Sequence, residues 1–370
     1  MDRRTAGHGL SVLITVTISF VLSACNGGDN GSSMSSTADY EQTNLVADTA
    51  GQAAHVDANL VNAWGIARSP SGPFWIADNH AGVSTIYDGT GTATGPMLVT
   101  VPPPAAMPGA TSAPTGLVFN STQDFVVLEG SNFAASLFIF ATEDGTISGW
   151  NTNVDPSNAI LEVDNSATDT IYKGLALGNN ADGNFLFATD FHNGKIDVFD
   201  GSFAPVTHVG AFVDANIPDG FAPFGVHNIN GQLYVTYAKQ DANAEDDEKG
   251  PGNGYVDVFD TDGNLIHRFA SQGTLNSPWG VALAPDNFGR FSNALLVGNF
   301  GDGRINAFDT NGTFLGQLSQ PNGTPITIDG LWGLIFGNGG SAGSTDTLFF
   351  TAGPGDEEHG LFGSLQAVSG

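Results

Sequence analysis

Apolar and polar residues alternate in short runs along most of the chain after residue 43, and Gly, Asn and Asp separate the runs. One signature recurs six times: a single residue, then Gly, then an alternating apolar run. Its glycines are spaced 51 to 58 residues apart. They are Gly65, Gly116, Gly174, Gly225, Gly280 and Gly333. Six units of this length fill positions 43–370 and indicate an internal repeat.

Each unit carries further strand signals after its glycine. A second apolar run follows, for example at 74–77, 125–128 and 185–188, and a third run alternates strictly, as at 195–200. Alternation of period two predicts half-buried strands, and the Asx-Gly pairs between runs favour tight turns. We therefore predict an all-β fold, a six-bladed β-propeller with four-stranded antiparallel blades. A solenoid of the same strands would need distinct polar caps at both ends.

The two ends of the repeat region predict how the ring closes. The sixth unit ends after Leu365, which leaves no room for its fourth strand, whereas residues 43–48 form an additional strand before the first signature. We expect this N-terminal strand to complete the last blade and so remove an open sheet edge. The recurring glycine fits this arrangement, because inner strands converge on the axis, where a side chain would collide with its neighbour.

The first 42 residues differ in composition from the rest of the chain. A short basic start is followed by a 13-residue apolar stretch at 10–22. This length is too short for a membrane span of about 20 residues and is typical of a signal peptide. Residues 26–42 are rich in Gly, Ser, Asn and Asp, as in flexible tethers.

The apolar stretch ends in Leu22-Ser23-Ala24-Cys25, which resembles the lipobox of bacterial lipoproteins, and Cys25 is the only Cys in the chain. The resemblance implies a lipoprotein signal peptide at 1–24, lipidation of Cys25, a tether at 25–42 and a propeller at 43–370. The protein would then be exported and lipid-anchored, with Asn26 favouring the outer membrane or cell surface. An ordinary signal peptide cut near Ala24 is the alternative.

The charge balance excludes several classes of partner. The chain has 10 Lys and Arg against 38 Asp and Glu, a formal charge of −28. So few cations cannot follow a phosphate backbone, which excludes nucleic-acid binding. The same charge opposes adsorption to anionic lipid, so we expect membrane contact only through the lipid anchor. A single Cys excludes a Cys-based metal site, and we expect a monomer.

The units resemble NHL-type repeats. The segments 62–67 and 277–282 are similar to an uncharacterised family of secreted bacterial six-bladed β-propellers, and the resemblance covers about 43–370. No activity is established for that family. The resemblance therefore implies a fold and adds little about chemistry.

The residue before each signature glycine predicts a common surface at one mouth of the axial channel. Four of the six are aromatic and would offer a stacking platform to sugars or other flat ligands. Lys173 is the only cation among them and could meet an anionic ligand. The alternative is that the rings pack the channel mouth and that Lys173 pairs with a carboxylate. The candidate ligand-binding residues are Trp64, Lys173, Phe224, Trp279 and Trp332.

Loops between second and third strands supply candidate metal ligands on the same face. Asp78, His80, Asp190 and His192 could hold a divalent metal, Ca or Zn, and activate water. The alternative is that the aspartates cap turns and that the histidines are solvated. An acidic insertion at 240–254 could also bind Ca²⁺, although a solvated charged loop fits its spacing better.

These observations favour an exported, lipid-anchored propeller that acts as a binding module for a small molecule, a carbohydrate or a protein. The alternative is a metal-assisted hydrolase or lyase with its site on the loop face of the channel. Propellers host both roles, so the fold does not choose between them.

Overall fold

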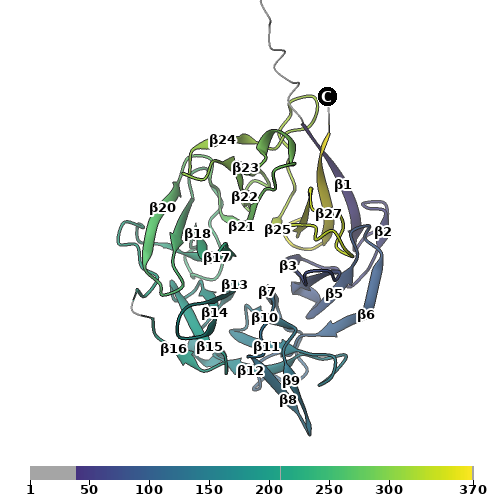
Figure 1. Ribbon diagram of the computed structural model, residues 1–370, viewed down its shortest axis with the longest axis vertical. Coiled ribbons are helices and arrows are strands. Elements are labelled where there is room, and N and C mark those ends of the chain that lie inside the picture. The colour runs from purple at the N-terminus through teal and green to yellow at the C-terminus, as the bar shows by residue number, and fades with distance from the viewer. Residues whose placement is uncertain (1–38, 209, 369–370) are drawn as a thin grey trace, which may run out of the picture. The chain divides into compact units, whose positions relative to one another are not determined.

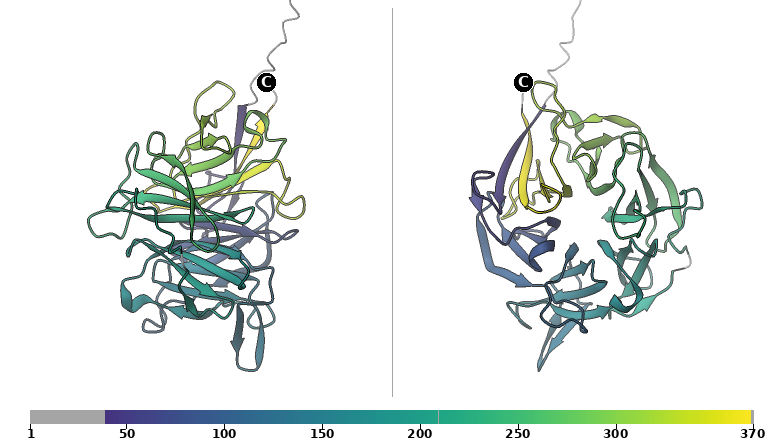
Figure 2. Two further views of the ribbon diagram at one scale, coloured as in Figure 1. Left: turned by 60° about the vertical axis from the view of Figure 1, so that its left-hand side comes forward. Right: turned by 180° about the vertical axis from the view of Figure 1, so that it is seen from behind.

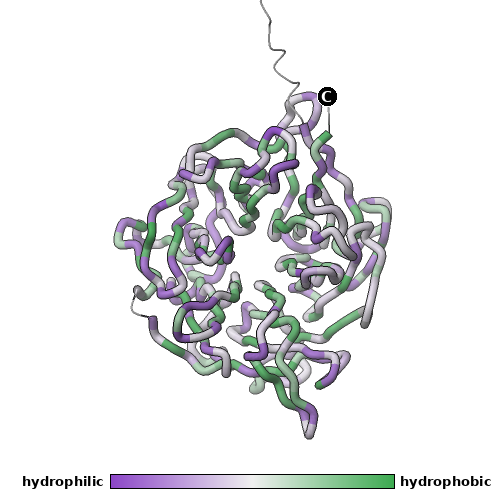
Figure 3. The backbone as a smooth tube through the Cα atoms, in the orientation of Figure 1, coloured by the Kyte–Doolittle hydropathy of each residue, from purple (hydrophilic) through white to green (hydrophobic). Residues whose placement is uncertain are grey.

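The computed structural model describes residues 39–208 and 210–368. Within these ranges, sheets radiate around a common axis as the blades of a propeller (Figure 1). Hydrophobic segments run along the strands, and hydrophilic turns join them (Figure 3). The predicted signal peptide and Cys25 lie outside the described residues. No helix in the described part of the chain is long and apolar enough to cross a membrane.

The first four strands of each blade, counted from the axis outward, pair antiparallel, and they follow one another along the chain except in blades 2 and 6. Blade 1 contains β3 (Ala63–Arg68), β4 (Phe74–Asp78), β5 (Val83–Tyr87) and β6 (Ala93–Thr100). Blade 2 contains β7 (Pro114–Phe119), β10 (Phe138–Thr142), β11 (Thr146–Trp150) and β12 (Ile160–Asp164). Blade 3 contains β13 (Tyr172–Asn179), β14 (Asn184–Asp190), β15 (Lys195–Asp200) and β16 (Pro205–Val206).

The second half of the ring repeats this order. Blade 4 contains β17 (Phe221–Ile229), β18 (Gln232–Lys239), β19 (Gly254–Phe259) and β20 (Leu265–Ser271). Blade 5 contains β21 (Pro278–Leu283), β22 (Leu295–Asn299), β23 (Ile305–Phe308) and β24 (Phe314–Gln317). Blade 6 contains β25 (Leu331–Phe336), β26 (Thr347–Ala352), β27 (Leu361–Val368), β1 (Asp39–Ala47) and the short β2 (His55–Val56). Three short 3-10 helices lie in loops: η1 (Asn79–Ala81), η2 (Ser166–Thr168) and η3 (Gly289–Phe291).

Strand β1 closes the ring, as predicted. It pairs antiparallel with β27, from Asp39 opposite Val368 to Ala47 opposite Leu361. The strand begins four residues before the predicted start at 43, and β2 adds a parallel pair at its outer edge. The first and last strands of the domain are thus hydrogen-bonded to each other, which removes the edge that an open stack would expose.

The signature glycines permit the inner strands to approach one another. A Cβ at Gly174 would lie 2.9 Å from the backbone nitrogen of Val226 in the next blade. A Cβ at Gly333 in blade 6 would lie 2.7 Å from Cγ2 of Ile66 in blade 1. Real Cβ atoms do not approach so closely, and the contact from blade 6 to blade 1 shows that the crowding runs around the whole ring.

Blade 2 departs from the predicted strand order. The apolar run at 125–128 was expected to be its second strand, but β10 takes that place. The run instead enters a hairpin of β8 (Val126–Glu129) and β9 (Asn132–Ala135), which projects from the ring (Figures 1 and 2). Phe125 has a φ of 60°, so the chain turns there before the hairpin begins. The run at 125–128 is continuously apolar, like the second runs of the other units, which explains the wrong assignment.

Candidate functional site

The aromatic residues that precede the signature glycines form a buried plug on the axis. Trp64, Phe224, Trp279 and Trp332 cluster with Phe191 and Phe300 in one hydrophobic core. The rings of Trp64 and Trp332 stack with centroids 3.7 Å apart. The ring of Phe300 also stacks on Trp332, with centroids 3.9 Å apart. The sequence left open whether these rings offer a stacking platform or pack the channel mouth. In the structure they cover one another, as in the alternative interpretation.

Lys173 lies beside this plug and is paired with two carboxylates. Its side chain is only 2% exposed, and Nζ lies 2.5 Å from Oε1 of Glu143 and 3.1 Å from Oδ1 of Asp246. The ammonium also lies 5.2 Å from the ring centroid of Trp64. Burial opposes its charge, but the two carboxylates outweigh burial and raise the pKa of Lys173. Lys173 is therefore protonated, and its ammonium group is already paired with the carboxylates of Glu143 and Asp246.

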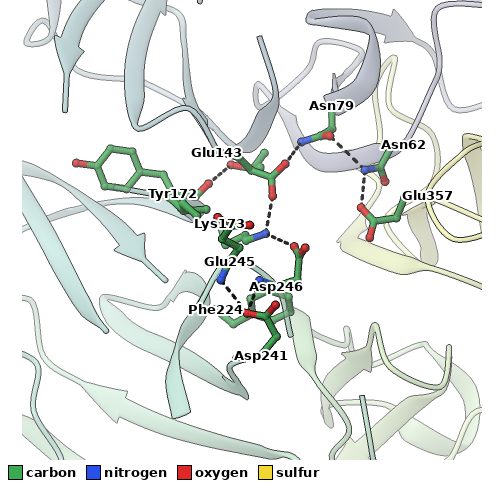
Figure 4. A network of polar contacts seen from close by, with 12 residues as sticks. Asn62, Asn79, Glu143, Tyr172, Lys173, Phe224, Asp241, Glu245, Asp246 and Glu357 are labelled. Carbon is green, nitrogen blue, oxygen red and sulfur yellow. Dashed lines mark hydrogen bonds and ion pairs between the residues drawn. The ribbon is translucent and has the colours of Figure 1, made fainter. Parts of the chain in front are cut away.

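A chain of amide and carboxylate groups extends from this ion pair across the mouth of the channel (Figure 4). Asn79 donates from Nδ2 to Oε2 of Glu143 at 2.8 Å. Asn62 donates to Oδ1 of Asn79 at 3.3 Å and to Oε2 of Glu357 at 2.7 Å. The indole of Trp332 donates to Oδ1 of Asn62 at 3.0 Å, which connects the network to the plug. The network thereby connects loops of blades 1, 2, 4 and 6 with the inner strand of blade 3.

Glu357 has an unusual environment within this network. Burial and the nearby charge of Glu143 raise its pKa to about 7, although the hydrogen bond from Asn62 acts in the opposite direction. Glu357 and Asp356 have φ values of 68° and 54°. Consecutive left-handed residues other than Gly are strained and occur mainly at functional sites. The raised pKa and the strained backbone together mark Glu357 as a candidate functional carboxyl group.

A groove of about 280 Å³ opens beside Glu143 on the loop face. We name it the loop-face groove, and its polar lining includes Glu143, Asp144, Asp169, His192 and Glu245. No Lys or Arg is among the described residues that line it. Four carboxylates around so small a space create a negative potential that attracts cations.

Two of these side chains carry polar atoms that are partly withdrawn from water. Asp144 accepts a 2.8 Å hydrogen bond from the backbone N–H of Ala113. Burial nevertheless raises its pKa, and the charge of Glu143 adds to the effect. Nδ1 of His192 is buried and has no hydrogen-bond partner within the described ranges.

The structure does not assemble the predicted metal ligands. Asp78 accepts the backbone N–H of Thr85 at 2.8 Å, and Asp190 accepts the side chain of Asn193 at 2.8 Å. Each aspartate is buried and closes the turn of its own blade, while His80 is exposed. Among residues 39–208 and 210–368, no three His, Cys, Asp or Glu side chains cluster as they would to hold a metal. The proposed set is therefore divided between separate turns.

Sequence reasoning missed several of the residues that the site contains. Glu143 and Asp144 lie in the second-to-third strand loop of blade 2, which the wrong placement of its second strand concealed. Correct assignment of β10 would have added them to the candidate loops. The acidic insertion was expected to be a solvated loop, yet Asp246 reaches Lys173 and Gln240 donates to the carbonyl of Phe191 at 2.6 Å.

Comparison with known proteins identifies relatives in Acanthamoeba polyphaga mimivirus. "Uncharacterized protein R648" is 37% identical over 331 residues, which cover 87% of this chain and 78% of the relative. "Uncharacterized protein L690" is 35% identical over 325 residues, which cover 85% and 82%. No family model matches the chain. These relatives are viral, whereas the sequence resemblance was to a bacterial family, so the bacterial origin and the lipoprotein signal stay predictions.

Solved structures share the fold. A protein of unknown function from Bacteroides thetaiotaomicron has a TM-score of 0.50 at 9% identity, covering 90% of this chain and 74% of that chain. Virginiamycin B lyase from Staphylococcus aureus has a TM-score of 0.48 at 12% identity, covering 89% and 99%. At this level of identity the likeness extends to the propeller fold alone.

Proposed function

We propose that this chain, which belongs to the family of the mimivirus proteins R648 and L690, is an exported, lipid-anchored β-propeller that binds a small cationic molecule in the loop-face groove. One observation carries the proposal: four carboxylates and, within the described residues, no Lys or Arg line a space of about 280 Å³. This volume is close to the lower end of the range for small-molecule sites. The ligand is therefore a compact amine or amino sugar.

The network beneath the groove supports this function by fixing Glu143. One carboxylate oxygen of Glu143 accepts from Lys173, and the other accepts from Asn79. A carboxylate has about four acceptor positions, so Glu143 retains capacity for an ammonium donor. Because both of its partners are buried, the side chain is oriented before a ligand arrives, which lowers the entropic cost of binding.

Calorimetric titration with putrescine, choline and glucosamine tests the proposal, with glucose as the uncharged match for glucosamine. We expect at least one amine to bind, and glucosamine to bind more tightly than glucose. Asp144→Asn and Glu245→Gln should each weaken binding about three- to tenfold, as expected for loss of a charge-assisted contact. Asp286→Asn, an exposed carboxylate outside the groove, should leave affinity unchanged. Equal affinities in all three variants would disprove the site.

Titration with calcium chloride separates this proposal from the metal-binding alternative. Calcium prefers six to eight oxygen ligands, and within the described part of the chain no three acidic or His side chains cluster as they would to hold a metal. We expect Ca²⁺ to bind more weakly than the best amine. Stoichiometric, EDTA-sensitive Ca²⁺ that Glu143→Gln abolishes would instead favour a metal site in the groove.

A second candidate function is acid–base catalysis by Glu357 in a hydrolase or lyase. The observation that favours it is the pKa of Glu357, about 7, together with the 2.7 Å hydrogen bond from Nδ2 of Asn62 to Oε2 of Glu357. A general acid or base is most effective when its pKa lies near the working pH. Hydrolysis of small lactone and ester probes tests it. Turnover with an inflection near pH 7 that Glu357→Gln abolishes would support catalysis, and turnover that the variant retains would refute this role.

Export and anchoring through Cys25 form a separable part of the proposal. Labelling of expressing cells with an alkyne fatty acid should mark the wild-type protein in the membrane fraction. Cys25→Ser should prevent labelling and release the protein from the membrane. Labelling that persists in this variant would contradict lipidation at Cys25.

A further inference from the structure

A second cavity lies on the axis at the opposite end of the inner strands. Its volume is about 450 Å³, and it is lined by β3, β7, β13, β17, β21 and β25. We name it the axial cavity. Most of its lining side chains are aliphatic or aromatic, and Trp279 of the plug also contributes. In the described chain, no Asp or Glu lines it.

Arg68 provides the positive charge in this cavity. Its Nε donates to the carbonyl of Phe336 at 2.6 Å, and Nη2 donates to that of Gly337 at 3.3 Å. Within residues 39–208 and 210–368, no carboxylate lies within 4.0 Å of this guanidinium. Burial lowers the pKa of Arg68, without an opposing effect from a nearby anion. Its charge nevertheless persists at any physiological pH.

The other basic side chain of the cavity does not share this charge. His227 forms a 2.9 Å hydrogen bond from Nε2 to the carbonyl of Trp279, and burial lowers its pKa to about 4. The imidazole is therefore neutral at pH 7. Arg68 is thus an uncompensated cation in the described part of a chain whose acidic residues outnumber its basic ones by 38 to 10.

We propose that the axial cavity binds an apolar carboxylic acid, such as a medium-chain fatty acid, with its carboxylate on Arg68 and its hydrocarbon chain against the inner strands. An arginine and a carboxylate form strong, directional hydrogen bonds. The aliphatic lining stabilises the tail by removing apolar surface from water. The volume lies within the usual range for small-molecule sites. Neither feature alone would select this ligand, since acetate lacks the tail and octanol lacks the charge.

Calorimetric titration of the full chain with octanoate, octanol and acetate tests the inference. We expect octanoate to bind at least tenfold more tightly than octanol, the factor that a charge-assisted hydrogen bond provides. We expect a difference of at least tenfold from acetate as well, because acetate lacks the hydrocarbon chain whose burial stabilises the complex. Arg68→Met should reduce octanoate affinity about tenfold and leave octanol affinity unchanged. Equal affinities for octanoate and octanol, equal affinities for octanoate and acetate, or no octanoate binding at millimolar concentration would overturn the proposal.

A second variant keeps the test decisive if Arg68→Met does not fold, because Arg68 also holds two backbone carbonyls. Leu283 lines the axial cavity and is 38% exposed, so Leu283→Asp adds a repelling carboxylate at a tolerant position. Leu315, in the outermost strand of the same blade and 44% exposed, provides the matched control Leu315→Asp. We expect only Leu283→Asp to weaken octanoate binding, by at least fivefold. The same affinity in both variants would exclude the axial cavity as the site.

Discussion

Replacement of Lys173 by Met removes the cation that joins Glu143 to Asp246 and retains an unbranched apolar side chain. Removal of one partner of a buried ion pair costs about 3–5 kcal/mol, because a charge is left uncompensated. Glu143 is 26% exposed, so water partly solvates it and the lower end of that range applies. Asp246 is 74% exposed, and its pair contributes less than about 1 kcal/mol. We expect a total loss of about 3 kcal/mol.

Thermal unfolding followed by circular dichroism measures this loss. At about 2.1 cal/mol/K per residue, a propeller of roughly 330 residues has an unfolding entropy near 0.7 kcal/mol/K, so Tm should fall by about 4 °C. Lys173→Met combined with Glu143→Gln should be less destabilised than the sum of the two single variants, because the unpaired carboxylate is then gone. Asp246→Asn is the control and should change Tm by less than 1.5 °C. A Tm within 1 °C of wild type for Lys173→Met, or strict additivity, would refute the reasoning.

Three further predictions concern substitutions of single residues. The pKa of Glu357, about 7, exceeds its value in the unfolded chain, so its contribution to stability is present in acid and is lost as pH rises through 7. Glu357→Gln should therefore raise Tm relative to wild type at pH 8.5 and not at pH 4, and a pH-independent offset would contradict this. Gly280→Ala places a Cβ against the carbonyl oxygen of Trp332 and should cost about 1–3 kcal/mol in urea unfolding; an unchanged midpoint would show that the inner strands can separate. Tyr40→Phe removes a 2.9 Å hydrogen bond to the carbonyl of Phe288 and should cost about 1 kcal/mol, which denaturant midpoints would reveal, whereas a stabilised variant would be inconsistent.

The fold was predictable because its determinants are local and repeated. Six glycines at nearly constant spacing identify the inner strands, and period-two alternation identifies most of the others. Closure by β1 followed from a count of strands at the two ends. The prediction for blade 2 was wrong because the inserted hairpin begins with an apolar run like that of a blade strand. Only tertiary packing shows that Val127 is buried while Val126 and Leu128 are exposed.

The candidate site was less predictable because its chemistry depends on contacts between distant residues. Asn62 and Glu357 are 295 positions apart, and no local signal distinguishes either from an ordinary turn residue. The aromatic residues were recognised, but their mutual stacking depends on the width of the axis. For Arg68, the decisive feature is the lack of a carboxylate within its described surroundings, a property that exists only in three dimensions.

The two ends of the axis differ in their chemistry. Between them, the rings of Trp64, Trp332 and Phe300 are in van der Waals contact, with centroids 3.7 and 3.9 Å apart, and Trp279 of the same plug lines the axial cavity. The loop face concentrates carboxylates around Glu143, while the opposite end holds Arg68 without a described counter-ion. Arg68 donates to two backbone carbonyls, which compensates its charge only in part, because a carbonyl dipole stabilises a guanidinium less than a carboxylate does. The carboxylate of the proposed ligand would complete this compensation, and the aliphatic lining would hold its hydrocarbon chain.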